Sequence, residues 1–249
     1  MNLVTQLLHI VSSGASAYIF SNGMRDRQTR PNLLAGFQMA ESGSVPFLQA
    51  LRDRANAEGE TGLAEKLDRH ANEEKRHGQI FAHGLKQLNK KVINFGQRVE
   101  KEIDRRPDES KRSPFFDAYF VGYSQAQLTP ENIPWEVFLA STYILELDAS
   151  KDFVRMAEAL PDDPISANLR QGILSIAADE TGHAAYLYEA MHSQFGSAKT
   201  QELVDQWRTR KVNAMLAAVQ SFITKGGKMG QMVEEGAPIE MPTQDPVAA

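Results

Sequence analysis

The segments EEKRHG (residues 73–78) and ADETGH (residues 178–183) decide the fold of this chain. Both lie in long stretches whose apolar residues recur with helical periodicity. In each segment a glutamate precedes a histidine by three positions: Glu74 with His77, and Glu180 with His183. Residues three apart share one face of a helix, so each motif directs a carboxylate and an imidazole to the same side.

A third match to this pattern serves as an internal control. Glu189 and His192 have the same spacing, but Glu189 follows Glu180 by nine positions. Nine residues correspond to about two and a half helical turns, which puts this pair on the opposite face of the helix. We therefore interpret Glu189 and His192 as surface residues.

The flanking sequence predicts helices over residues 31–57, 61–91, 134–160, 165–194 and 198–224. Turn residues separate them: 58–62 after the first, with Thr61 as the expected N-cap of the second, 161–164 after the third, and Gly196 after the fourth. No convincing strand pattern is found. The fold class is therefore expected to be all-α, with two helical hairpins joined by a long crossover and additional flanking helices.

The hairpin geometry adds two glutamates to the motifs. Residues equidistant from a hairpin turn lie side by side, which pairs Glu41 with the motif at residues 74–77 and Glu146 with the motif at residues 180–183. Both glutamates lie within apolar stretches, where a carboxylate is costly unless it is paired or bound to metal. The sequence predicts a shared cluster of six residues: Glu41, Glu74, His77, Glu146, Glu180 and His183. This is the kind of ligand set that holds two iron or manganese ions.

The composition narrows the chemistry further. The 249 residues include no cysteine, which excludes disulfides, iron–sulfur clusters, thiolate zinc sites and cysteine nucleophiles. A metal must therefore be held by histidine and carboxylates. The formal charge of -5 argues against a broad nucleic-acid surface.

The rest of the chain is expected to be less regular. Residues 92–132 read as a long connection with one or two short helices, residues 3–20 as a short amphipathic helix, and residues 226–249 as an irregular tail. Residues 1–225 would form one domain whose core spans about 31–195. We expect no signal peptide, no membrane span and a cytoplasmic location.

The order Glu41, Glu74-x-x-His77, Glu146, Glu180-x-x-His183 resembles the ferritin-like diiron-carboxylate superfamily, over about residues 31–195. The segments around His77 and His183 look like the two motifs of soluble acyl-carrier-protein desaturases, although Gly182 stands where an Arg is usual. The resemblance implies a ferritin-like four-helix bundle with a long crossover between its second and third helices. It makes Glu74 and Glu180 bridging ligands and Glu41 and Glu146 terminal ligands.

The resemblance also suggests residues beyond the metal ligands. Asp179 would orient a ligand histidine, a part that Glu73 or Arg76 would take in the first half. Ser150, four residues after Glu146, stands where oxygenases of this superfamily often carry a hydroxyl. Glycines near the ligands, Gly43, Gly78 and Gly182, indicate either space or close helix packing. Aromatic residues at helical spacing are candidates for an apolar pocket or for plain core: Phe37, Phe81, Phe138, Tyr143, Phe153 and Tyr186.

The expected function is a non-haem diiron oxidase or oxygenase, with two Fe ions (Mn being the alternative), that uses O2 to oxidise an organic, partly apolar substrate. Without cysteine, electrons would come from an external reductase or ferredoxin, or from peroxide. A homodimer is compatible with this reading. One alternative is a ferroxidase, peroxidase or manganese catalase. Another is a tRNA-modifying hydroxylase, for which basic clusters at residues 25–30 and 98–112 would contact phosphate. A metal-free structural helical protein is a further alternative.

Overall fold

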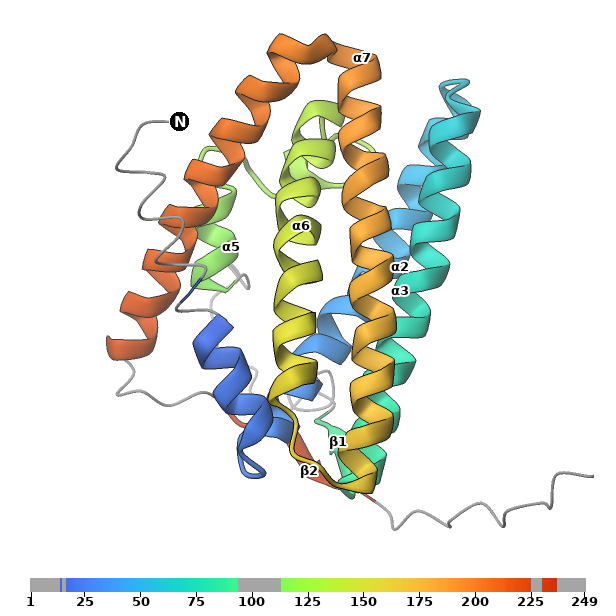
Figure 1. The fold of residues 1–249 in the computed structure, drawn as a ribbon. Helices are drawn as coiled ribbons and strands as arrows, with labels where there is room; N and C mark the ends of the chain where they lie inside the picture. The colour runs from blue at the N-terminus through green and yellow to red at the C-terminus, as the bar shows by residue number, and fades with distance from the viewer. Residues whose placement is uncertain (1–13, 15–16, 94–112, 225–229, 237–249) are drawn as a thin grey trace, which may run out of the picture.

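The computed structural model describes residue 14 and residues 17–93, 113–224 and 230–236, and these residues are mostly helical (Figure 1). The principal helices are α2 (Arg30–Ala57), α3 (Thr61–Gln87), α5 (Pro114–Tyr119), α6 (Trp135–Ala159) and α7 (Pro164–Thr224), with a short 3-10 helix η1 (Ala126–Leu128). Residues 17–25 are also helical. The all-α prediction is confirmed for the described part of the chain.

Two helical pairs form the body of the molecule. Helix α2 packs along α3, α6 packs along the first half of α7, and the pairs meet where α3 contacts α7 (Figure 1). A tight turn joins α2 to α3, and Gly59 adopts there a positive φ of 84° that favours glycine. Glu60, rather than the predicted Thr61, occupies the N-cap position of α3. The turns predicted at residues 58–62 and 161–164 correspond to connections at residues 58–60 and 160–163 in the structure.

Helix α7 changes direction at Gly196, whose φ of 75° and ψ of 167° are not helical. In Figure 1 the helix rises beside α6, turns at this point and descends beside α5. The break matches the predicted stop between the fourth and fifth helices. The returning half covers the short helix α5, where Tyr119 and Phe120 contact Trp207 edge to face.

The prediction that the chain has no strands is wrong at one place. Helix α3 ends at Gln87 instead of near residue 91, because β1 (Lys90–Val92) pairs antiparallel with β2 (Val233–Glu235). The register sets Lys90 opposite Glu235 and Lys91 opposite Glu234, so opposite charges face each other across the ladder. The tail after residue 226 is therefore not irregular throughout.

Of the long connection over residues 92–132, the structure describes residues 92–93 and 113–132. There, Ser113 caps α5 by accepting a hydrogen bond from the amide of Phe116, and η1 follows before α6 begins. The predicted charge clusters at residues 98–112 lie outside the described residues, as does most of the predicted N-terminal helix over residues 3–20.

Two apolar cores lie at different heights of the helical pairs. The upper core in the view of Figure 1, nearer the α2–α3 turn, includes Leu51, Leu67, Leu139, Leu187 and Trp207. The lower core, nearer the strands, includes Leu34, Phe81, Phe153, Met156 and Ile173. On every one of the four long helices the two sets are separated in sequence by the positions of the predicted metal ligands. A polar layer thus divides one core from the other.

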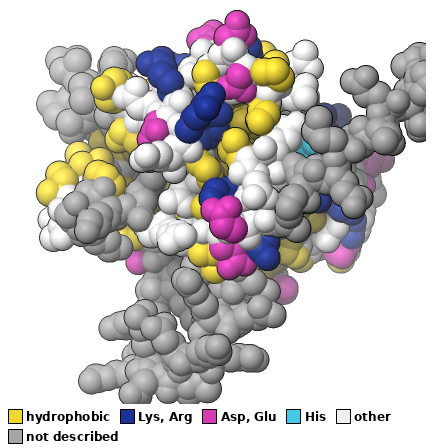
Figure 2. All heavy atoms as spheres, turned by 90° about the horizontal axis from the view of Figure 1, so that it is seen from below, with side chains coloured by type: hydrophobic (Ala, Val, Ile, Leu, Met, Phe, Trp, Pro, Cys, Tyr) yellow, Lys and Arg dark blue, Asp and Glu magenta, His cyan; other side chains and the backbone are white. Residues whose placement is uncertain are grey.

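Figure 2 shows the end of the molecule where β1 and β2 lie. On its described surface, Lys and Arg side chains are interspersed with Asp and Glu. Among the residues described, no helix combines the length and apolar character that crossing a membrane requires.

Candidate metal centre

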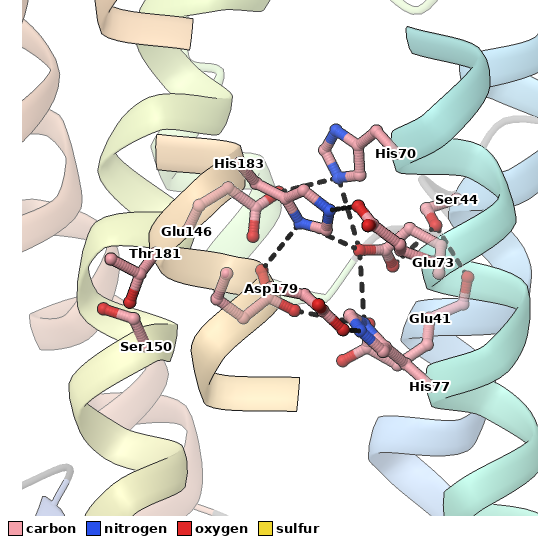
Figure 3. Close-up of polar contacts among 12 residues, drawn as sticks. Glu41, Ser44, His70, Glu73, His77, Glu146, Ser150, Asp179, Thr181 and His183 are labelled. Carbon is pink, nitrogen blue, oxygen red and sulfur yellow. Dashed lines mark hydrogen bonds and ion pairs between the residues drawn. The ribbon is translucent and has the colours of Figure 1, made fainter. Parts of the chain in front are cut away.

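The polar layer gathers all six residues predicted as metal ligands, in the arrangement of Figure 3. Helix α2 contributes Glu41, α3 contributes Glu74 and His77, α6 contributes Glu146, and α7 contributes Glu180 and His183. Most are withdrawn from solvent: Glu74, His77, Glu180 and His183 are each at most 4% exposed. Such groups are costly to bury without partners, so the layer must be neutralised internally or by a bound cation.

The ligand atoms fall into two groups that share Glu74. The two-histidine group consists of His70, Glu74, Glu146 and His183, and the one-histidine group consists of Glu41, Glu74, His77 and Glu180. Within each group, one ligand atom from every residue lies within 4.8 Å of the others. Each group could hold a metal ion, and the Glu74 carboxylate belongs to both.

His70 is a member that the sequence prediction missed. It precedes Glu74 by four residues on α3 and is 1% exposed. Its Nε2 lies 3.3 Å from Glu74 Oε1 and 3.5 Å from Glu146 Oε1, and its ring stacks on His183 at 3.6 Å between centroids. A signal existed, since i and i+4 residues share a helix face as do i and i+3. A search limited to Glu-x-x-His does not see it.

Each imidazole has one nitrogen facing the cluster and the other held by an outer partner. His77 Nε2 lies 2.9 Å from Asp179 Oδ2, and His183 Nε2 lies 2.9 Å from Glu73 Oε2. His70 Nδ1 lies 2.7 Å from the Tyr186 hydroxyl. Carboxylates accept hydrogen bonds, so Asp179 and Glu73 favour a proton on the outer nitrogens of His77 and His183, as in metal-binding histidines. The Tyr186 hydroxyl can donate to His70 or accept from it.

Each outer carboxylate contacts a histidine of the other helical pair. Asp179 on α7 contacts His77 on α3, whereas Glu73 on α3 contacts His183 on α7. The structure thus puts Asp179 against a predicted ligand histidine, on the opposite helix rather than its own. Glu73 takes the equivalent place in the other half, and Arg76 forms an ion pair with Asp179.

The Ser44 hydroxyl, which was not predicted from the sequence, contacts the cluster, whereas that of the predicted Ser150 does not. The Ser150 hydroxyl donates to the carbonyl of Leu147 at 3.0 Å within its own helix, and no dashed line in Figure 3 joins it to the cluster. Ser44, three residues after Glu41, lies with its Oγ 3.0 Å from Glu74 Oε2 and 2.6 Å from the Glu41 carbonyl oxygen. A hydroxyl donates one hydrogen, so these two acceptors compete for it.

Burial and mutual repulsion perturb the acids and bases of the layer. Burial, followed by the charge of Glu180, raises the pKa of Glu146 to about 8, and burial also raises the pKa of Glu41 well above its usual range. Burial opposes protonation of His77, yet the nearby carboxylates of Glu180 and Glu41 raise its pKa to about 11. Without a metal, protons retained on these groups reduce the negative charge of the carboxylates.

The other titrating groups complete this balance. Burial and the neighbouring His70 lower the pKa of His183 to about 4. Burial disfavours the Glu74 carboxylate, but the nearby imidazoles of His70 and His77 prevail and lower its pKa. Glu74, the residue common to both ligand groups, lies within 4 Å of all three histidines of the layer, at 3.3 Å from His70, 3.6 Å from His77 and 3.7 Å from His183.

The environment of one buried nitrogen, His77 Nδ1, indicates whether a cation fits among these residues. His77 Nδ1 has no hydrogen-bond partner, although it lies 3.2 Å from Glu180 Oε1 and 3.5 Å from Glu41 Oε2. An unsatisfied nitrogen surrounded by carboxylate oxygens has the donor set of a cation site. The residues present could therefore hold a metal ion.

Of the three glycines near the cluster, one is required for close helix packing and two face open space. A Cβ at Gly78 would collide with the Ser42 hydroxyl, so Gly78 permits close approach of α2 and α3. At Gly43 and Gly182 a Cβ would meet nothing within 4 Å.

Comparisons with known proteins add no assignment, because no family model, no curated protein and no solved structure matches the chain.

Proposed function

We propose that this protein is a diiron oxidase or oxygenase built on a ferritin-like four-helix bundle of α2, α3, α6 and the first half of α7. The observation that carries the proposal is the pair of overlapping ligand groups joined at Glu74, inside an otherwise apolar body. The repeated order of ligands along the two helical pairs supports the same reading, as does the resemblance of the motifs to the superfamily.

The two-histidine group would hold one iron and the one-histidine group the other, with Glu74 between them. When bound, the two irons would supply the activation of O2 and the oxidising equivalents for an organic substrate. Manganese is the alternative metal, because the same nitrogen and oxygen ligands suit both.

The residues of the chain would provide geometry, proton control and exclusion of water. Asp179, Glu73 and Tyr186 hold the outer nitrogens of the three histidines, which fixes the orientation of the three rings. The upper and lower cores keep the layer away from bulk water. Since the chain has no cysteine, electrons would reach the site from a separate donor protein or with peroxide.

Metal analysis tests this function. Protein purified after growth with iron and manganese should carry about two metal ions per chain, detected by mass spectrometry. The double variant His77→Ala plus His183→Ala should lose them, whereas His83→Ala plus His192→Ala, which changes two exposed histidines, should keep them. Fewer than one metal per chain in the unaltered protein, with no change in the first double variant, would contradict the proposal.

A ferroxidase, peroxidase or manganese catalase remains the second candidate, because it would use the same ligands without an organic substrate. Turnover of Fe(II) or peroxide alone at high rate would favour it. The tRNA-modifying alternative receives less support from the described residues. Arg30 of its basic cluster is buried and donates to the Met24 carbonyl and to Ser166, so it is not available to phosphate.

A further inference from the structure

The face between α2 and α6 is the widest of the described helical body. No Cα of α2 comes within 8 Å of a Cα of α6, unlike the neighbouring pairs α2 with α3, α3 with α7 and α6 with α7. Aromatic side chains span the gap on both sides of the polar layer. Phe47 meets Phe138 at 6.2 Å between ring centroids on the upper side, and Phe37 meets Phe153 at 5.3 Å on the lower side.

The lower side of this face is filled. Phe37 also stacks on Phe81 at 5.4 Å and contacts Phe20 at 5.7 Å, which makes a continuous aromatic packing in the lower core. Of the residues considered from sequence as pocket candidates, Phe37, Phe81 and Phe153 are therefore core residues.

The upper side is hollow. A pocket of about 390 Å³ opens between α2, α5, η1 and α6, and its lining includes Phe47, Phe116, Phe120, Leu128, Phe138 and Thr142. This volume lies at the small end of the ~300–1,000 Å³ typical of ligand sites. We call it the α2–α6 pocket.

The pocket reaches toward the polar layer. Along α6, Phe138, Thr142 and Glu146 succeed one another every four residues, which aligns them roughly on one face about one helical turn apart. On α2, Phe47 follows Ser44 by three residues, and the Ser44 hydroxyl contacts Glu74. The inner end of the pocket thus lies about one turn from Glu146 on α6, and about one turn from Ser44 on α2, whose hydroxyl contacts the candidate ligand Glu74.

The lining specifies the chemistry of a ligand. Its faces are mainly aromatic and aliphatic, and its polar groups are the hydroxyls of Ser141 and Thr142 and the amide of Gln125. None of the lining residues carries a charge, so an ionised ligand would lose its hydration without compensation. Aromatic rings favour flat ligands that stack or meet edge to face.

We propose that the α2–α6 pocket binds a neutral aromatic molecule of one or two rings with a single hydrogen-bonding group, and that this is the substrate of the metal centre. The first part rests on the pocket alone, and the second rests on the proposed function.

Binding of 4-fluorophenol, followed by ¹⁹F NMR on chelator-treated protein, tests the first part. The probe should bind the unaltered protein at least tenfold more tightly than 4-fluorobenzoate, its charged counterpart. Thr142→Phe, which fills the pocket, should weaken binding at least tenfold. Val154→Phe alters an exposed position of the same helix and should leave binding unchanged. Circular dichroism checks that both variants fold, and Leu128→Phe in η1 provides a second filling variant. Equal binding by both filling variants and the unaltered protein, or equal binding of benzoate, would overturn the assignment.

The same probe with Mn(II)-loaded protein tests the second part. Manganese should strongly increase the ¹⁹F relaxation rate of bound 4-fluorophenol, and Thr142→Phe should abolish the increase. Probe that binds the pocket without enhanced relaxation, although manganese is bound, would overturn the substrate assignment. A chain that binds the probe but no metal would refute the proposed function and leave the pocket intact, so the two failures are distinguishable.

Discussion

Each histidine of the polar layer offers one nitrogen to the carboxylates and has the other held from outside the cluster. His70, bonded to Tyr186 and lying between Glu74 and Glu146, makes the two ligand groups unequal in their nitrogen content. At the scale of the residue, we expect consequences for the metal affinity of each ligand group and for the pH dependence of folding stability.

Replacing His70 should weaken one metal position selectively. In His70→Ala we expect the two-histidine group to lose affinity by at least tenfold, while the one-histidine group retains its four ligands. Isothermal titration with Mn(II) should show two binding events in the unaltered protein and one weakened event in the variant. His83→Ala, on the exposed side of α3, is the control. Unchanged titration in His70→Ala would show that His70 is not a ligand.

Neutralising the outer carboxylates should weaken metal binding without removing a ligand. Asp179→Asn and Glu73→Gln keep the size of the side chains but reduce their strength as acceptors for His77 and His183. Losses of outer partners of this kind typically cost about 10- to 100-fold in metal affinity. The measurement is competition with a chromophoric chelator. Affinities within a factor of two of the unaltered protein would contradict the assigned role.

The metal-free protein should lose stability as the pH rises from 6.5 to 8. The pKa of Glu146 is raised from 4.5 to about 8, so the folded state keeps this proton after the unfolded chain has lost it. Stability therefore falls as the pH rises from about 4.5 to 8, which includes the interval from 6.5 to 8. The pKa of His77 is raised from 6.5 to about 11, which has the same sign. The lowered pKa of His183, about 4, acts below pH 6.5 and adds no slope above it.

Thermal unfolding of chelator-treated protein measures this trend. Glu146→Gln should show a smaller decline in Tm between pH 6.5 and 8, whereas Glu136→Gln, at an exposed position of the same helix, should behave like the unaltered protein. A Tm that rises over this interval would be inconsistent with the raised pKa values.

At the scale of the element, Gly172 allows α7 to pack closely against α3. In α7 a Cβ at Gly172 would lie 2.6 Å from Cγ2 of Ile80 on α3, whereas at Gly182 it would meet nothing within 4 Å. The β-branched Ile80 has few rotamers with which to yield.

Alanine at these two glycines should therefore have opposite effects on stability. Gly172→Ala should destabilise by about 1–3 kcal/mol through overpacking. Gly182→Ala should stabilise by about 0.5–1 kcal/mol, since it reduces the freedom of the unfolded chain at an unobstructed helical position. Urea unfolding of the metal-free protein measures both. A stabilised Gly172→Ala would mean that α3 and α7 can separate at little cost.

The elements differ in how far the sequence predicts them. The long helices and their turns follow from local periodicity, Pro31, Gly59 and Gly196, so their positions could be predicted. The β1–β2 ladder could not, because it joins short segments about 140 residues apart whose pairing leaves no local pattern. The six clustered residues followed from hairpin symmetry. His70 breaks that symmetry, and Ser44 belongs to no motif, which is why both were missed.

At the scale of the whole molecule, two apolar cores enclose a layer of coupled acids and bases. The buried Glu and His side chains are thus concentrated at one height of the helical body. A bound cation would offset the free-energy cost of burying them there.

Bound metal should therefore stabilise the entire fold. A ligand that binds only the folded state at 100 times its Kd contributes about 2.7 kcal/mol. Saturating Mn(II) should raise the Tm by several degrees relative to the chelator-treated protein. The variant lacking His77 and His183 should show no such shift. An equal shift in that variant would place the binding elsewhere.

The most direct test of the central claim is anomalous X-ray diffraction from crystals of the metal-loaded protein, collected at the iron and manganese absorption edges. We expect two peaks, one among His70, Glu74, Glu146 and His183 and one among Glu41, Glu74, His77 and Glu180, with Glu74 in contact with both. Crystals of protein saturated with metal that show no peak within this layer, or a peak only at the molecular surface, would contradict it.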